Sequence, residues 1–144
     1  MEKIVAGIAP CGIDCVNCEV FIGTITAEMK TRMAGVLHLD PEKVPCRGCR
    51  IERGCRLHLS SCPTLDCVTA KGHAWCYECA EFPCGMLHPS ADRAETLPHN
   101  LKVFNLCRIR ALGPEKWLAQ EAGLSRRKYY QGKMVIGQGP VLQG

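Results

Sequence analysis

The sequence predicts a small α-rich domain built from helices and irregular loops, with little sheet. Its 144 residues fit one domain of ordinary size, which we expect to span 1–144. Of the 12 cysteines, eleven lie between residues 11 and 84. The later sequence carries one cysteine and shows helical patterns. We therefore expect a cysteine-rich metal-binding region over 9–88 and a helical C-terminal region over 89–144.

Cap residues predict helices between the cysteine loops. Thr26 is predicted to be the N-cap of a helix over 27–37. The arginine-rich segment 45–60 is polar and is predicted to be a loop. The other elements expected in this region are a helix over 62–71, capped by Ser61 and followed by Gly72, and a short helix from Pro83 to His88.

Proline and glycine divide the later region into segments, because proline favours the first turn of a helix and glycine its end. The expected elements are a helix from Pro98 to Leu112 ended by Gly113, a helix from Pro114 stopped by Gly123, a helical turn capped by Ser125, and a strand from Lys133 to Ile136.

The cellular compartment decides how the cysteines are interpreted. The first residues contain one lysine, one glutamate and an apolar stretch too short for the core of a signal peptide. No run reaches the roughly 18 apolar residues of a membrane span. We therefore expect a cytoplasmic protein, in which thiols are kept reduced. Dense cysteine in that compartment favours bound metal over disulfides.

Three Cys-x-x-Cys units carry the metal hypothesis. In a tight turn, the two intervening residues let both sulfurs reach one tetrahedral zinc ion at about 2.3 Å. Each unit therefore supplies half of a tetracysteine, zinc-ribbon-like site, so that metal would cross-link the loops. With the flanking cysteines included, the ten candidate metal ligands are Cys11, Cys15, Cys18, Cys46, Cys49, Cys62, Cys67, Cys76, Cys79 and Cys84.

About two zinc ions are expected, and they would use eight of the ten candidates. The sequence leaves the pairing open. If the segment 62–67 is helical, the side chains of Cys62 and Cys67 point about 140° apart and one would serve a different site from the other. His73 is the best histidine candidate, although a loop histidine in solvent is the simpler interpretation.

Two cysteines stand apart from the candidate set. Cys107 lies among apolar neighbours and is expected to be a buried free thiol. Cys55 has arginines on both sides. It is either an additional metal ligand or a cysteine with no part in metal binding.

Two other classes of function stay open. The spacing Cys11-x3-Cys15-x2-Cys18 also suits iron–sulfur chemistry, so a [4Fe-4S] protein for electron transfer or redox sensing is the first alternative. A nucleic-acid-binding zinc module is the second, with Tyr129 and Tyr130 stacking on bases. The formal charge of +4 supports it weakly, because two zinc ions with four thiolates each would offset that charge.

The basic residues proposed for phosphate contact are Arg47, Arg50, Arg53, Arg56, Arg126, Arg127 and Lys128. Their simpler interpretation is that they offset the negative charge of thiolate-rich metal sites. We expect no catalytic activity, because the sequence shows no nucleophile–base arrangement, phosphate loop or dinucleotide fingerprint. No membrane partner is expected, and a protein partner stays open.

The motifs CGIDCVNCEVFIGT, CRGC and CPTLDCVTAKGHAWCYECAEFPC resemble a small cysteine-rich family of bacterial and archaeal proteins catalogued only as a domain of unknown function. The resemblance covers roughly residues 9–88. That family is presumed to bind zinc, and the ten candidate cysteines fall on its cysteine positions. Cys55 and Cys107 lie outside the common pattern. The resemblance implies zinc binding but neither a reaction nor a partner.

Overall fold

The structure is a computed structural model that describes residues 5–57 and 61–144. Its helices are α2 (Ala27–Leu37), α3 (Cys49–Glu52), α4 (Pro63–Ala70), α5 (Lys102–Leu112), α6 (Pro114–Trp117) and α7 (Gly123–Gln131). The strands β1 (Lys133–Val135) and β2 (Gly139–Val141) form one antiparallel pair. The prediction of an α-rich domain with little sheet is confirmed. No helix in the described ranges is long and apolar enough to cross a membrane.

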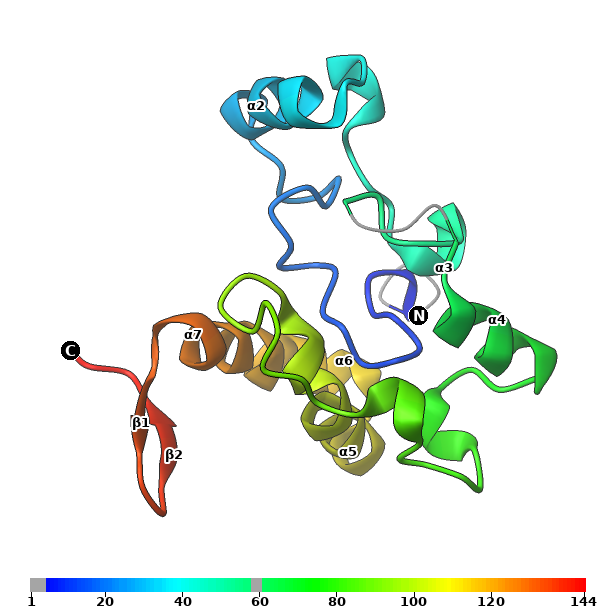
Figure 1. Cartoon of the computed structure of the whole chain (residues 1–144), viewed down its shortest axis with the longest axis vertical. Coiled ribbons are helices and arrows are strands. Elements are labelled where there is room, and N and C mark those ends of the chain that lie inside the picture. Colours follow the sequence, from blue (N-terminus) through cyan, green and yellow to red (C-terminus); the bar gives the residue numbers. More distant parts are fainter. Residues whose placement is uncertain (1–4, 58–60) are drawn as a thin grey trace.

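The helix α2 begins where the sequence predicts. The Thr26 hydroxyl oxygen accepts a hydrogen bond from the Met29 amide at 3.1 Å, as expected of an N-cap. The helix lies apart from the other helices (Figure 1). Its buried residue, Ala34, joins a small apolar cluster with Val20, Val44 and Cys46.

The helix α4 begins one residue later than predicted. Its N-cap is Cys62, not Ser61, and no side chain caps it. Proline explains the shift, because Pro63 occupies the first helical position, where its fixed φ and missing N–H cost nothing. The helix predicted from Pro83 to His88 is a single 3₁₀ turn over Gly85–Leu87.

Part of the predicted loop over 45–60 is helical, because α3 lies within it. The last residues of that prediction, 58–60, fall outside the described residues.

The predicted break at Gly123 is wrong. The chain passes from α6 through a π-helical turn, Leu118–Ala122, directly into α7, and Ser125 lies inside α7 instead of capping a new turn. Trp117 and Ala122 are almost fully buried on this run. Burial of their side chains outweighs the roughly 1 kcal/mol that glycine costs within a helix. The predicted strand is confirmed over Lys133–Val135, and its partner β2 was not predicted.

The main hydrophobic core joins the C-terminal helices to the first cysteine loop. It consists of Ile8, Trp75, Leu87, Leu106, Ile109, Trp117 and Ala122. Gly12 lets the loop lie directly on α5, because it has φ +92° and a Cβ there would meet the Lys102 carbonyl oxygen. The buried Asn105 amide also donates to the Gly12 carbonyl oxygen at 2.8 Å.

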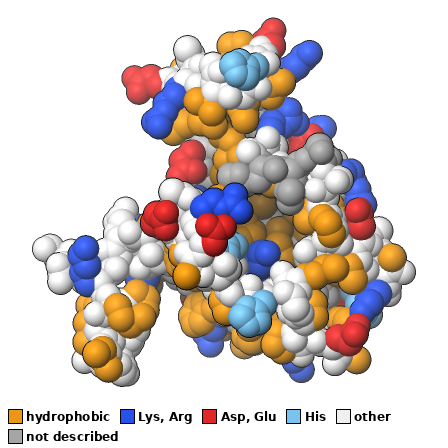
Figure 2. Space-filling view, viewed as in Figure 1, with side chains coloured by type: hydrophobic (Ala, Val, Ile, Leu, Met, Phe, Trp, Pro, Cys, Tyr) orange, Lys and Arg blue, Asp and Glu red, His pale blue; other side chains and the backbone are white. Residues whose placement is uncertain are grey.

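Two surface features follow from this packing. Leu106 and Ile109 point into the core, whereas Cys107 on the same helix is exposed, so the expectation that Cys107 is buried is wrong. The β1–β2 hairpin projects from the body and carries hydrophobic side chains on its surface, with Ile136 at its turn 97% exposed (Figures 1 and 2).

Candidate metal centre

The first two Cys-x-x-Cys units, far apart in sequence, lie side by side. Phe21 and Cys46 form an isolated parallel bridge, in which the Cys46 amide donates to the Val20 carbonyl oxygen at 2.8 Å. Cys18 packs against the small apolar cluster that contains Cys46. At the other end, Cys49 neighbours Cys15, and its side chain is the main reason that the pKa of the Cys15 thiol is raised. We call Cys15, Cys18, Cys46 and Cys49 the paired-turn group.

Tight turns present the thiols of this group. The Cys18 amide donates to the Cys15 carbonyl oxygen at 3.0 Å, which closes the first turn. In the second, the Gly48 amide donates to the Cys46 sulfur at 3.4 Å. Gly48 has φ +96°, and a Cβ there would collide with the Ala6 carbonyl oxygen. Only glycine therefore fits at position 48, directly before the second cysteine of this turn.

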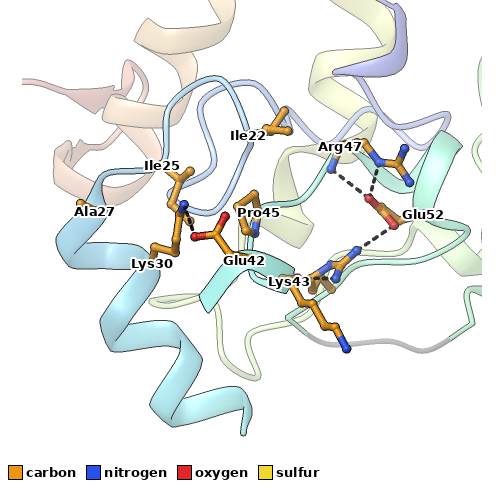
Figure 3. A pocket seen from close by; sticks show the side chains of 10 residues that line it. Ile22, Ile25, Ala27, Lys30, Glu42, Lys43, Pro45, Arg47 and Glu52 are labelled. Atoms are coloured by element: carbon orange, nitrogen blue, oxygen red, sulfur yellow. Dashed lines mark hydrogen bonds and ion pairs between the residues drawn. The ribbon is translucent and has the colours of Figure 1, made fainter. Parts of the chain in front are cut away.

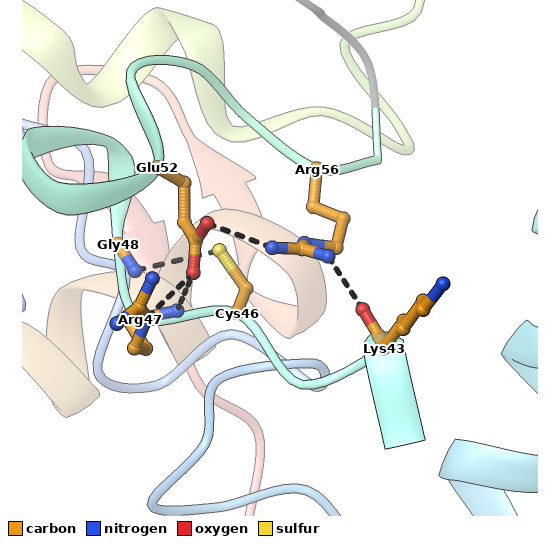
Figure 4. Close-up of polar contacts among 6 residues, drawn as sticks. All are labelled: Lys43, Cys46, Arg47, Gly48, Glu52 and Arg56. Carbon is orange, nitrogen blue, oxygen red and sulfur yellow. Dashed lines mark hydrogen bonds and ion pairs between the residues drawn. The ribbon is translucent and has the colours of Figure 1, made fainter. Parts of the chain in front are cut away.

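An ion-pair network fixes the second turn to the chain that follows it (Figure 4). Glu52 accepts from the Arg47 side chain at 2.9 Å and pairs with Arg56 at 2.8 Å. Arg56 also donates to the Lys43 carbonyl oxygen at 2.5 Å. The hydrogen bond from Arg47 is the main reason that the pKa of Glu52 lies below its usual range.

A groove of about 650 Å³ lies between this network and α2 (Figure 3). Its lining includes Ile22, Ile25, Pro45 and the paired side chains of Lys30 and Glu42, which are 3.4 Å apart. Among the residues that the structure describes, neither a cysteine nor a histidine lines it. Those residues therefore give the groove no thiolate or imidazole ligand.

A second set of cysteines surrounds one cavity of about 440 Å³. We call Cys67, Cys76, Cys79 and Cys84, which all line it, the cavity group. The Lys71 ammonium donates to the Cys79 sulfur at 3.3 Å and also pairs with Glu81. Sequence reasoning missed Lys71, because nothing in the local sequence links it to a cysteine eight residues away.

The cavity also shows where some of the residues lie whose role in metal binding the sequence left open. His73 is among its lining residues. Cys67 lines the cavity, whereas Cys62, the N-cap residue of the same helix, does not. Cys55 is half-buried and belongs to neither group.

Burial keeps several of these thiols protonated when no cation is near. It raises the pKa of Cys18 to about 11 and that of Cys76 to about 12. The pKa of Cys15 is raised by the neighbouring Cys49 side chain and then by burial, and that of Cys11 by burial. A metal ion binds the thiolate, so its binding here would displace protons.

Arg50 lies between the two groups. Its guanidinium donates to the carbonyl oxygens of Ile8 and Ala74, each at 2.8 Å, and covers the Trp75 ring at 4.5 Å. The thiols of Cys49, Cys11, Cys15 and Cys76 all act on its pKa, against the burial that lowers it. One positive charge is therefore close to cysteines from both groups.

Several of the other residues predicted to contact nucleic acid make contacts within the protein. Arg53 pairs with Asp66 at 3.4 Å, and Arg126 pairs with Glu19 at 3.5 Å. Tyr129 donates its hydroxyl to the Leu97 carbonyl oxygen and meets Tyr130 edge-on. These contacts favour the simpler interpretation, in which the basic side chains serve the fold and its thiol-rich sites.

The donor set suits zinc, but the side chains do not yet form a closed cage. Among the described residues, no three His, Cys, Asp or Glu side chains surround a common position for an ion. The ten candidate cysteines are thiols that form no disulfides. Zinc binding would therefore require the cysteine turns to close around the ion, and short turns can make such a movement.

Residues 7–89 match a family described as a protein of unknown function, DUF3795. The chain belongs to this family. The match covers more than half of the chain and includes all ten candidate cysteines, which confirms the resemblance seen in the motifs. The helices α5 to α7 and the hairpin lie beyond the matched part of DUF3795. Searches of the curated proteins and of the solved structures found no match.

Proposed function

We propose that this protein is a non-catalytic zinc-binding protein, in which zinc holds the cysteine loops together. The observation that carries the proposal is the parallel bridge between Phe21 and Cys46, which sets two Cys-x-x-Cys units side by side and leaves Cys49 next to the Cys15 thiol. Cys18 and Cys46 lie on the same apolar cluster, and the two turns would have to close further to bring all four sulfurs to one ion. Two facing turns of this kind supply the four thiolates of a structural zinc site.

Energetics support a structural role for the ion. In the part of the chain that the structure describes, the apolar cluster at the paired-turn group has four buried members, Val20, Ala34, Val44 and Cys46. A cluster of this size supplies little hydrophobic stabilisation. Structural zinc contributes roughly 10–16 kcal/mol in zinc-finger peptides at neutral pH. Zinc would therefore decide whether residues 11–57 keep their arrangement.

The formal net charge of the chain is consistent with about two bound zinc ions. A zinc ion with four thiolates has a net charge of −2, so two such sites would bring the formal +4 of the chain close to zero. Arg50, which neighbours cysteines of both groups, would offset part of that negative charge locally. A [4Fe-4S] cluster uses the same four-thiolate chemistry and is the competing cofactor.

Elemental analysis and an absorption spectrum, both on protein purified without oxygen, test the proposal. We expect about two zinc ions per chain and no visible band. Iron with acid-labile sulfide and a brown colour would reject zinc in favour of the cluster. The double variant C15S/C49S should lose one zinc, whereas C107S, which changes an exposed cysteine outside both groups, should lose none.

A strong chelator provides a second test of the structural role. Removal of zinc, verified by elemental analysis, should unfold the cysteine-rich region and reduce the circular dichroism signal. Retention of the full signal and of native protease resistance after verified removal would contradict a structural role for the metal.

A further inference from the structure

We propose that a second metal centre forms in the 440 Å³ cavity, with Cys67, Cys76, Cys79 and Cys84 as its four ligands and Lys71 as a hydrogen-bond donor to the Cys79 thiolate. Cys11 and Cys62 are then the two candidates that remain outside both centres. This inference rests on the proposed zinc-binding function and assigns the ligands of its second ion.

The four cysteines reach the cavity from three short elements. Cys67 lies in α4, Cys76 begins the 3₁₀ turn Cys76–Glu78 with Cys79 as its C-cap, and Cys84 is the N-cap of the turn Gly85–Leu87. An ion bound at this point would join α4 to both turns. Such a cross-link between segments that share few contacts is the usual task of a structural zinc.

Backbone hydrogen bonds hold the two turns in shape. The Cys79 amide donates to the Cys76 carbonyl oxygen at 3.2 Å, and the Phe82 amide donates to the Cys79 carbonyl oxygen at 3.1 Å. The Leu87 amide donates to the Cys84 carbonyl oxygen at 3.0 Å. Each thiol is thus attached to a closed turn, and closure of the cage needs the turns to move as units.

Part of the cavity wall is apolar. Val68, Phe82 and Leu87 line it together with the cysteines, and Val68 and Leu87 are buried, whereas Cys84 is exposed. On its apolar side the wall lowers the local dielectric constant and strengthens the electrostatic attraction between the thiolates and the ion.

Lys71 supplies the countercharge. Its ammonium lies 3.3 Å from the Cys79 sulfur and is held in place by Glu81. A zinc ion with four thiolates is a dianion, so a charge-assisted hydrogen bond from an ammonium stabilises the loaded site. Partners of this kind typically change metal affinity by about 10- to 100-fold.

Position excludes Cys11 and Cys62 from this centre. Neither is among the residues that line the cavity. Cys62 precedes the first turn of α4, whereas Cys67 lies five residues later, on the side of that helix that faces the cavity. The ten candidates therefore divide into the paired-turn group, the cavity group and one leftover pair.

Stoichiometry of three double-serine variants, purified without oxygen, tests this division. C67S/C79S should lose one zinc and C15S/C49S the other, whereas C11S/C62S should keep both. Loss of an ion from C11S/C62S, or retention of both by C67S/C79S, would overturn the assignment. A wild-type protein without zinc would reject the proposed function itself, and a wild type with a single zinc that survives C67S/C79S would reject only the cavity centre.

Lys71 allows a test in which every cysteine stays in place. Against a chromophoric chelator, K71Q should weaken one of the two zinc ions at least tenfold and leave the other unchanged, and K71R should restore most of the loss. In cobalt-substituted C15S/C49S, the visible and thiolate-to-metal bands report the cavity centre alone, and K71Q should shift them. Equal zinc affinities in K71Q and wild type would reject the role of Lys71.

Discussion

Replacement of Arg50 by methionine probes the link between the two cysteine groups. Arg50 follows Cys49 directly and donates to the Ile8 and Ala74 carbonyl oxygens, which lie 42 residues before and 24 residues after it. Its guanidinium also covers the Trp75 ring at 4.5 Å. Methionine keeps an apolar stem of similar length on Trp75 but removes the charge and both hydrogen bonds.

The structure allows the loss of stability to be estimated. The partly buried bond to Ile8 is charge-assisted, and its loss costs about 2 kcal/mol, because the Ile8 carbonyl is left without its donor. The exposed bond to Ala74 contributes less, since water can replace the donor, and the cation–π contact adds about 1 kcal/mol. We expect a total loss of about 3 kcal/mol.

Urea denaturation of the protein as purified measures this loss. With a slope of about 2 kcal/mol per molar urea, the midpoint should fall by about 1.5 M. R53M is the matched control, because Arg53 lies on the same short segment and, among the described residues, its side chain makes a single 3.4 Å pair with Asp66, both side chains being more than half exposed. That pair should contribute less than about 0.5 kcal/mol. Equal midpoints for R50M and R53M would refute the central position assigned to Arg50.

Two further variants test the turns and the helix packing. G48A should lower the free energy of unfolding by about 3 kcal/mol, because Gly48 has φ +96° and no room for a Cβ. It should also weaken the binding of one zinc ion in chelator competition. The control G35A should be neutral or stabilising, because the space around Gly35 is open. E121Q should lower the urea midpoint at neutral pH, because Glu121 accepts two hydrogen bonds from Arg108 at 2.8 and 2.6 Å. Arg108 holds the pKa of Glu121 below its ordinary 4.5, so this stabilisation is present above pH 4.5 and is lost as the pH falls through the lowered pKa. The midpoints of E121Q and wild type should therefore converge in acid, and a difference that persists at pH 2 would exclude the carboxylate as its source.

Local rules predicted elements whose ends depend on single residues. Thr26 caps α2 and Gly113 ends α5, because a capping hydroxyl and a glycine with positive φ act within one turn of the chain. The same rules failed at Gly123 and Ser125, where burial of Trp117 and Ala122 keeps the helix continuous. The error at Cys107 has a similar origin, since apolar neighbours in sequence do not define which face of a helix meets the core.

The sequence by itself identified the ten candidate cysteines and the family, because ligand type and Cys-x-x-Cys spacing are local properties that survive without coordinates. It left open which cysteines share a site. Only the tertiary structure brought Cys15 to Cys49, gathered Cys67 with Cys84 around one cavity, and set Arg50 between the groups. The physical reason is that these neighbours come from segments held together by long-range backbone hydrogen bonds and by a shared core. A local sequence pattern does not determine which distant segments pack together.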